Sequence, residues 1–280
     1  MPVLPLLAWL ASIVLLLVAS TKQFASARLG GLTAAVFAST PLIWVQWHSQ
    51  PASIYPLLFV AGWLAAVVYS DQLRSPLWAA LAGGVLGLGT YGSHAATVMM
   101  PVYLVLTIAL VAPDRVRSRS TLALVGAFAI AVAPLAVSVL RQPDDFRRTF
   151  TAYHIYDAYR FNVLQGAKEL TSWVSLTARS EMYYDYFNPT LLFLTGRVLL
   201  FPLVVLLPTG LYRMLRHEPT PLARLSLAGF FAAPLAAALT AERPVPARII
   251  YITIFAAVVS TYGVRQLLSW RQDARTSLIG

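Results

Sequence analysis

Two arginines of this sequence are suited to bind an anion, and a set of polar and aromatic residues accompanies them as candidates for a site. Arg243 and Arg248 lie among prolines in the run ERPVPARII. The planar guanidinium group of arginine can form two parallel hydrogen bonds to a phosphate. The accompanying candidates are His48, Ser49, Gln50 and Tyr55, then Ser93 and His94, and then Tyr183, Tyr184 and Asp185. These residue types indicate recognition of a phosphate group.

Other chemistries find less support in the sequence. The absence of cysteine excludes disulfides, thiolate zinc sites and cysteine nucleophiles. The four histidines lack metal-ligand spacing, so no metal site is predicted, and the residues leave open whether a divalent cation acts as a cofactor. We find no GxSxG, P-loop or HExxH motif, and no GxGxxG after a strand.

The elements that must position the polar residues are membrane-spanning helices. Of the 280 residues, 58% are hydrophobic and only 11% are charged, and the mean hydropathy is +0.68. Soluble domains carry about 25% charged residues. Several apolar runs reach the roughly 18 residues needed to cross a hydrocarbon core. The sequence therefore predicts an all-α, polytopic transmembrane bundle with an extracytoplasmic segment that carries interfacial helices.

We predict nine spans, at 3–20, 29–46, 53–70, 77–92, 95–112, 121–140, 194–212, 222–240 and 247–268. They form a first transmembrane bundle over 1–140, followed by an extracytoplasmic segment over 141–193. A C-terminal bundle with a cytoplasmic tail follows over 194–280. In the fourth span, Gly83 and Gly87 form a GxxxG pair, which lets helices approach closely in lipid.

Basic residues are distributed unequally between alternate connections. One set of connections and the C-terminal tail carry Lys22, Arg28, Arg74, Arg115, Arg117, Arg119, Arg213, Arg216, Arg224, Arg265, Arg271 and Arg275. The opposite short connections carry only Arg243 and Arg248. Because Lys and Arg concentrate in cytoplasmic loops, we expect a multi-pass protein of a bacterial-type plasma (inner) membrane, with a cytoplasmic C-terminus and an extracytoplasmic 141–193. This distribution also explains the net charge of +10 without a nucleic-acid partner.

The extracytoplasmic segment is predicted to contain an amphipathic helix. Its apolar residues recur at spacings of three or four, which is typical of one helix face, and Trp173 lies beside them. They are Phe161, Leu164, Ala167, Leu170 and Val174. Such a helix directly after a span suits the membrane interface.

Transfer of a sugar from a lipid phosphate would need both a cation and a carboxylate on the extracytoplasmic side. Arg243 or Arg248 could stabilise the charge that the leaving phosphate gains, and a carboxylate could accept a proton from the acceptor hydroxyl. The acids on this side are Asp144, Asp145, Asp157, Glu169, Glu181, Asp185 and Glu242. Their spacing alone singles out none of them.

Four short runs resemble motifs of the GT-C membrane glycosyltransferases, in particular the bacterial group similar to protein O-mannosyltransferases and the lipid A aminoarabinose transferase. Residues 49–55 read SQPASIY, where the family often has S-Q-E-A-R-x-Y. Residues 93–94 match a Thr-His turn, 188–193 match an sPxxLF run, and 246–248 match Pro-x-Arg. The order and spacing of these runs agree over most of the chain.

The resemblance implies an all-helical glycosyltransferase that moves a sugar from a polyprenyl-phosphate carrier to a glycan, lipid or protein acceptor. Its active site would face the periplasm or cell exterior, with the bilayer as a further partner. Arg248, Arg243, Ser49, Gln50, Tyr55, His94 and Tyr184 are the expected substrate-binding residues. The catalytic residue stays unknown, with Asp185 and Glu181 as weak candidates.

The sequence departs from the family's pattern in two places. Pro51 and Ser53 stand where relatives have glutamate and arginine. The family's catalytic aspartate lies in a loop between its first two spans, and the first span here, followed by STKQFASARLGG, resembles the family's second span. We therefore expect that one helix and the catalytic loop are absent from the N-terminus, in agreement with the external Met1 that nine spans require.

Two other functions remain open. A truncated or inactive relative could serve as a non-catalytic lipid-binding or scaffold subunit of the membrane. A polytopic transporter is the second alternative, since transporters place polar groups near the bilayer midplane at broken helices. The clustering of polar residues at one face and the lack of a clear internal repeat count against transport.

Overall fold

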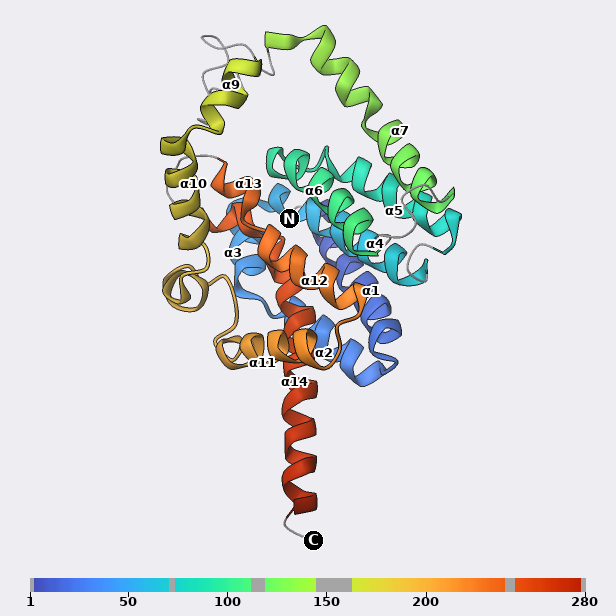
Figure 1. Cartoon of the computed structure of the whole chain (residues 1–280), viewed down its shortest axis with the longest axis vertical. Coiled ribbons are helices and arrows are strands. Elements are labelled where there is room, and N and C mark those ends of the chain that lie inside the picture. Colours follow the sequence, from blue (N-terminus) through green and yellow to red (C-terminus); the bar gives the residue numbers. More distant parts are fainter. Residues whose placement is uncertain (1–2, 71–73, 112–118, 145–162, 240–244, 278–280) are drawn as a thin grey trace.

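The computed structural model describes residues 3–70, 74–111, 119–144, 163–239 and 245–277 (Figure 1). In these residues all regular structure is helical, as the sequence predicts. The elements are α1 (Val3–Phe24), α2 (Ala27–Ala38), α3 (Pro41–Ser49), η1 (Pro51–Ile54), α4 (Tyr55–Tyr69), α5 (Pro76–Gly89), α6 (His94–Val111), α7 (Arg119–Arg141), α9 (Val163–Leu170), α10 (Trp173–Asp185), η3 (Thr190–Thr195), α11 (Leu203–Arg216), α12 (Pro221–Ala232), α13 (Leu235–Ala238), η4 (Pro246–Ile249) and α14 (Ile252–Ser277).

Six helical segments of the described chain are long and apolar enough to cross a membrane. They are Val3–Phe24, Pro51–Tyr69, His94–Val111, Arg119–Arg141, Pro221–Ala238 and Ile252–Arg271. The pair α2 and α3, bent by 42° at its break, would make a seventh. These helices indicate a multi-pass membrane protein.

The count of nine spans is not confirmed, because three of the predicted segments fail as single spanning helices. The segment 29–46 is divided into α2 and α3. The fourth span shortens to the 14 residues of α5. The segment 194–212 is interrupted after the π-helical turn η3, and α11 begins only at Leu203. Between them Arg197 has a positive φ of 47°, a conformation that an L-residue cannot repeat along a right-handed helix.

The predicted amphipathic helix is divided into α9 and α10. Ser172 lies between them with an extended backbone, and its hydroxyl accepts a hydrogen bond from the Ser175 N–H. Such side-chain acceptors start helices, so the apolar face cannot continue through this point. Leu164, Trp173 and Val174 are exposed, whereas Phe161 lies outside the described residues.

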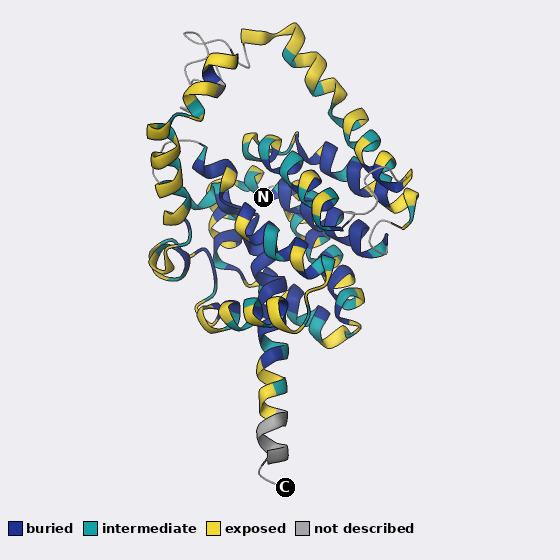
Figure 2. Ribbon diagram, in the orientation of Figure 1, coloured by how far each residue is buried: buried dark blue, intermediate teal, exposed yellow. Residues whose placement is uncertain are grey.

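Most of the core is one large cluster of buried side chains that includes residues of both predicted transmembrane bundles, and buried residues are found throughout the bundle (Figure 2). At its centre Trp63 of α4 stacks on Tyr103 of α6, with ring centroids 5.1 Å apart. The indole N–H of Trp63 donates to the hydroxyl of Thr107 over 3.1 Å. Phe255 of α14 packs against both rings. The predicted domain boundaries at 141 and 193 stay a prediction.

Close packing of α5 on α7 depends on two glycines. A β-carbon at Gly83 would collide with the carbonyl oxygen of Leu124, and one at Gly87 would lie 2.9 Å from that of Phe128. The backbone of α7 therefore lies directly on α5, as the GxxxG spacing predicts.

Candidate functional site

The short helix η4 positions the arginine that the sequence singles out. Val245 is extended, Pro246 occupies the first turn, and Ile249 is buried, so the turn is anchored on both sides of Arg248. The side chain of Arg248 is half-buried. Residues of α3 and of α13 lie against η4. Arg248 therefore lies at the end of the bundle where the connection 49–55 also lies, which we call the η4 end.

The connection 49–55 brings three predicted residues to the η4 end. Ser49 and Gln50 are exposed at the end of α3, and the Ser49 hydroxyl donates to the carbonyl of Val45 over 3.0 Å. Tyr55 is half-buried as the first residue of α4. The neighbouring His48 is also exposed, with Nδ1 2.8 Å from the Trp44 carbonyl oxygen. These side chains have room to meet a ligand.

The turn between α5 and α6 belongs to the same end. The hydroxyls of Ser93 and Tyr251 lie 3.3 Å apart, which joins this turn to the residues directly after η4. Ser93 also accepts a hydrogen bond from the Ala96 N–H at the start of α6. His94 is exposed. Tyr251 is 1% exposed, and sequence reasoning missed it because a tyrosine in an apolar run resembles an ordinary core residue.

Helix α10 docks against the bundle through polar side chains. The hydroxyl of Tyr183 donates to the Phe231 carbonyl over 2.8 Å, and the Arg179 guanidinium donates to the carbonyl of Leu239. Tyr186 is buried and accepts a hydrogen bond from the Val245 N–H over 3.0 Å. These contacts join α10 to α12, to the end of α13 and to the start of η4.

Burial changes the titration of two docked side chains. It lowers the pKa of Arg179 from its usual value. Burial also raises the pKa of Tyr183, and a charge on the neighbouring Tyr184 would raise it further. Tyr183 therefore keeps its proton at neutral pH and remains a hydrogen-bond donor.

The candidate acids lie on the other side of α10. Glu181, Tyr184 and Asp185 are all exposed, and Tyr184 retains 71% of its accessible surface. The structure therefore groups Arg248 with the connection 49–55 and the turn at Ser93, while Glu181 and Asp185 are exposed on α10. Asp145, Asp157, Glu242 and Arg243 lie outside the described residues.

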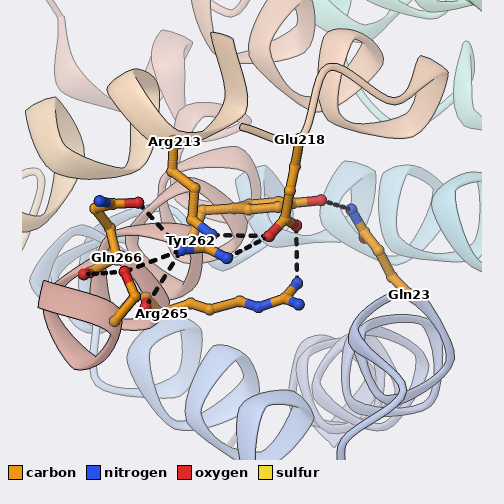
Figure 3. A network of polar contacts seen from close by, with 7 residues as sticks. Gln23, Arg213, Glu218, Tyr262, Arg265 and Gln266 are labelled. Carbon is orange, nitrogen blue, oxygen red and sulfur yellow. Dashed lines mark hydrogen bonds and ion pairs between the residues drawn. The ribbon is translucent and has the colours of Figure 1, made fainter. Parts of the chain in front are cut away.

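A polar network at the opposite end of the bundle was not foreseen (Figure 3). Glu218 follows α11 and uses both carboxylate oxygens: Oε1 accepts from Nε of Arg213 over 2.8 Å, and Oε2 accepts from Arg265 over 2.8 Å. Arg213 also donates to Oε1 of Gln266 over 3.1 Å. Close by, Nε2 of Gln23 donates to the Tyr262 hydroxyl over 3.0 Å. The feature of the sequence that could have indicated this network is Glu218 itself, an acid in a connection whose other charged residues are Arg213, Arg216 and Arg224.

The η4 end thus combines a half-buried arginine with exposed serine, glutamine and histidine and a half-buried tyrosine. Within the described ranges, no three histidine, aspartate or glutamate side chains come together to hold a metal ion. No protein-family model, curated protein or solved structure matches this chain.

Proposed function

We propose that the protein binds a polyprenyl-phosphate-linked sugar at the η4 end and transfers the sugar to an acceptor on the extracytoplasmic side. The observation that carries the proposal is the half-buried Arg248 at the end of an apolar helical bundle. The planar guanidinium group of arginine can form two parallel hydrogen bonds to a phosphate. The lipid chain of the carrier would hold that phosphate at the membrane.

The surroundings of Arg248 suit such a donor. Ser49, Gln50 and Tyr55 offer hydroxyl and amide groups to sugar oxygens, and Ser49 ends α3, an element that adjoins η4. When the glycosidic bond breaks, the phosphate gains negative charge. A guanidinium group that is already in place stabilises that charge more in the transition state than in the ground state.

The acceptor hydroxyl must lose a proton, and Glu181 or Asp185 of α10 are the described carboxylates proposed for this step. Both are exposed beside the docked face of α10, whose Tyr186 contacts the residue before η4. The GT-C type of chemistry and the bacterial inner membrane rest on the sequence resemblance and on the distribution of basic residues.

A lipid-binding scaffold without catalysis is the second candidate. The exposure of Glu181 and Asp185 favours it, because no contact within the described part of the chain holds either side chain towards Arg248. Ser53, at a position where relatives carry arginine, instead donates to Oε1 of Gln46 over 3.4 Å. Such a subunit would keep the lipid-phosphate site and lack the proton acceptor.

Two assays separate these functions. Membranes that contain the protein are first exposed to a photo-crosslinkable polyprenyl phosphate and then to a radiolabelled polyprenyl-phosphate sugar. We expect Arg248→Ala to reduce crosslinking, and to reduce any transfer about a hundredfold, while Arg224→Ala, an exposed arginine outside the η4 end, has no effect. Crosslinking without transfer supports the scaffold. Equal crosslinking of Arg248→Ala and Arg224→Ala would refute the lipid-phosphate site itself.

A further inference from the structure

Helix α7 has two halves with different surroundings. Residues 119–131 lie on α5, where the two glycines bring the backbones together. Beyond Pro134 the side chains are largely exposed, and Leu140 retains 81% of its accessible surface. This half rises away from the bundle (Figure 1). Proline removes a backbone donor and disturbs the preceding turn, so Pro134 marks the point where α7 can bend.

The hydroxyl of Tyr91 occupies the backbone of α7 at this point. It donates to the carbonyl of Ala131 over 3.0 Å and accepts from the N–H of Leu135 over 3.1 Å. In an uninterrupted helix those two groups would bond to each other. A side chain that bonds to both groups of the helical ladder can influence the angle of a helix at that point, and here it comes from another part of the chain.

Tyr91 is carried by a turn with little freedom of its own. The N–H of Tyr91 donates to Leu88, and that of Gly92 donates to Gly89 over 3.0 Å. The hydroxyl of Thr97 donates to the Thr90 carbonyl over 3.1 Å. A β-carbon at Gly92 would lie 3.1 Å from Cγ of Pro56, so the turn is also wedged against α4. A displacement of one side of this turn must therefore move its other side.

The other side of the turn contacts the residues that follow η4. Ser93 is paired with the hydroxyl of the buried Tyr251, three residues after Arg248. A continuous series of contacts thus runs from η4 through Tyr251, Ser93 and Tyr91 to the backbone of α7 on both sides of Pro134.

We propose that the turn 90–93 couples the position of η4 to the angle of the C-terminal half of α7, with the Tyr91 hydroxyl as the contact that sets this angle. The coupling requires no ligand and does not depend on the proposed transferase activity. Whatever binds beside Arg248 and moves η4 also moves residues 135–141. Tyr91 is a positioning residue in this arrangement.

Distance measurements between spin labels test the coupling, and the absence of native cysteine makes labelling specific. One pair joins Val45→Cys to Leu140→Cys and reports on the C-terminal half of α7. A second pair joins Val45→Cys to Leu122→Cys and reports on the half held by α5. All three positions are exposed. Each pair is measured in the otherwise unchanged chain and with Tyr91→Phe, Tyr251→Phe or Tyr212→Phe.

We expect Tyr91→Phe and Tyr251→Phe to broaden the distances to residue 140 and to leave those to residue 122 unchanged. Tyr212→Phe, at the opposite end of the chain's described core, should change neither. If Tyr91→Phe leaves the distribution of distances to residue 140 unchanged, the Tyr91 hydroxyl does not set the angle of α7 and the proposal is wrong. An effect of Tyr91→Phe without one of Tyr251→Phe overturns the link to η4.

Discussion

Neutralising Glu218 should destabilise the whole helical bundle. Glu218→Gln keeps the shape of the side chain but removes the charge that two arginines share. Nε of Arg213 and the nearer terminal nitrogen of Arg265 both donate over 2.8 Å, so both carboxylate oxygens have a cationic partner. Because Arg213 belongs to α11 and Arg265 to α14, the carboxylate holds two helices together.

The magnitude follows from the exposure of each partner. The side chains of Glu218 and Arg213 are 20% and 13% exposed, so their pair is worth about 1.5–3 kcal/mol, as for a charge-assisted hydrogen bond. Arg265 is 40% exposed, and solvent reduces its contribution to roughly 0.2–1 kcal/mol. We therefore expect Glu218→Gln to lower the free energy of unfolding by about 2–4 kcal/mol.

Reversible unfolding in mixed micelles, followed by tryptophan fluorescence, measures this change. Glu169→Gln is the matched control, since Glu169 is exposed on α9. A double-mutant cycle with Arg213→Gln isolates the pair. If Glu218→Gln were no more destabilising than Glu169→Gln, or if its effect were the same with and without Arg213, the shared carboxylate would not hold the helices together.

Three further predictions concern packing and helix ends. In the same assay, Gly83→Ala should lower the free energy of unfolding by about 1–3 kcal/mol, because the added β-carbon collides with the Leu124 carbonyl. Gly84→Ala is the control and should change it little, since nothing lies within 4 Å of that position. Equal effects of the two substitutions would refute the close approach of α7. Trp63→Phe removes the indole donor and leaves the buried Thr107 hydroxyl without it, so we expect a loss of about 1–3 kcal/mol, against almost none for the exposed Trp173→Phe. Ser172→Ala should weaken the start of α10 by about 1 kcal/mol, seen as faster amide exchange in its first turn; an unchanged rate, as expected for the exposed Ser180→Ala, would argue against the cap.

The sequence predicts the features of this protein that depend on composition and on near neighbours. Apolar runs and their length indicate the spanning helices, and the GxxxG pair indicates the contact of α5 with α7. Hydropathy averages a segment, however, and cannot register a single residue such as Arg197, whose positive φ accompanies the interruption of one predicted span. The division of α9 from α10 depends on the local competition of the Ser172 hydroxyl for a backbone N–H.

The parts that could not be predicted depend on contacts between distant residues. Tyr91 at the edge of an apolar run is typical of an aromatic anchor, and nothing near it in the sequence indicates α7. Glu218 and Arg265 are 47 residues apart in the chain. At the η4 end, the residue types could be selected from sequence, whereas the joining of Ser93 to Tyr251 required the fold.

The docking of α10 has a consequence for the order in which the protein assembles. The carbonyls of Phe231 and Leu239 lie at the ends of α12 and α13, where helical backbone partners run out, and α10 supplies the donors from Tyr183 and Arg179. Unpaired carbonyls are costly within a bilayer. Because α10 is synthesised before α12, its donors are already present when the segment 221–238 is made. An earlier segment of the chain can thus pair backbone carbonyls on both sides of Pro234 as soon as the later segment folds.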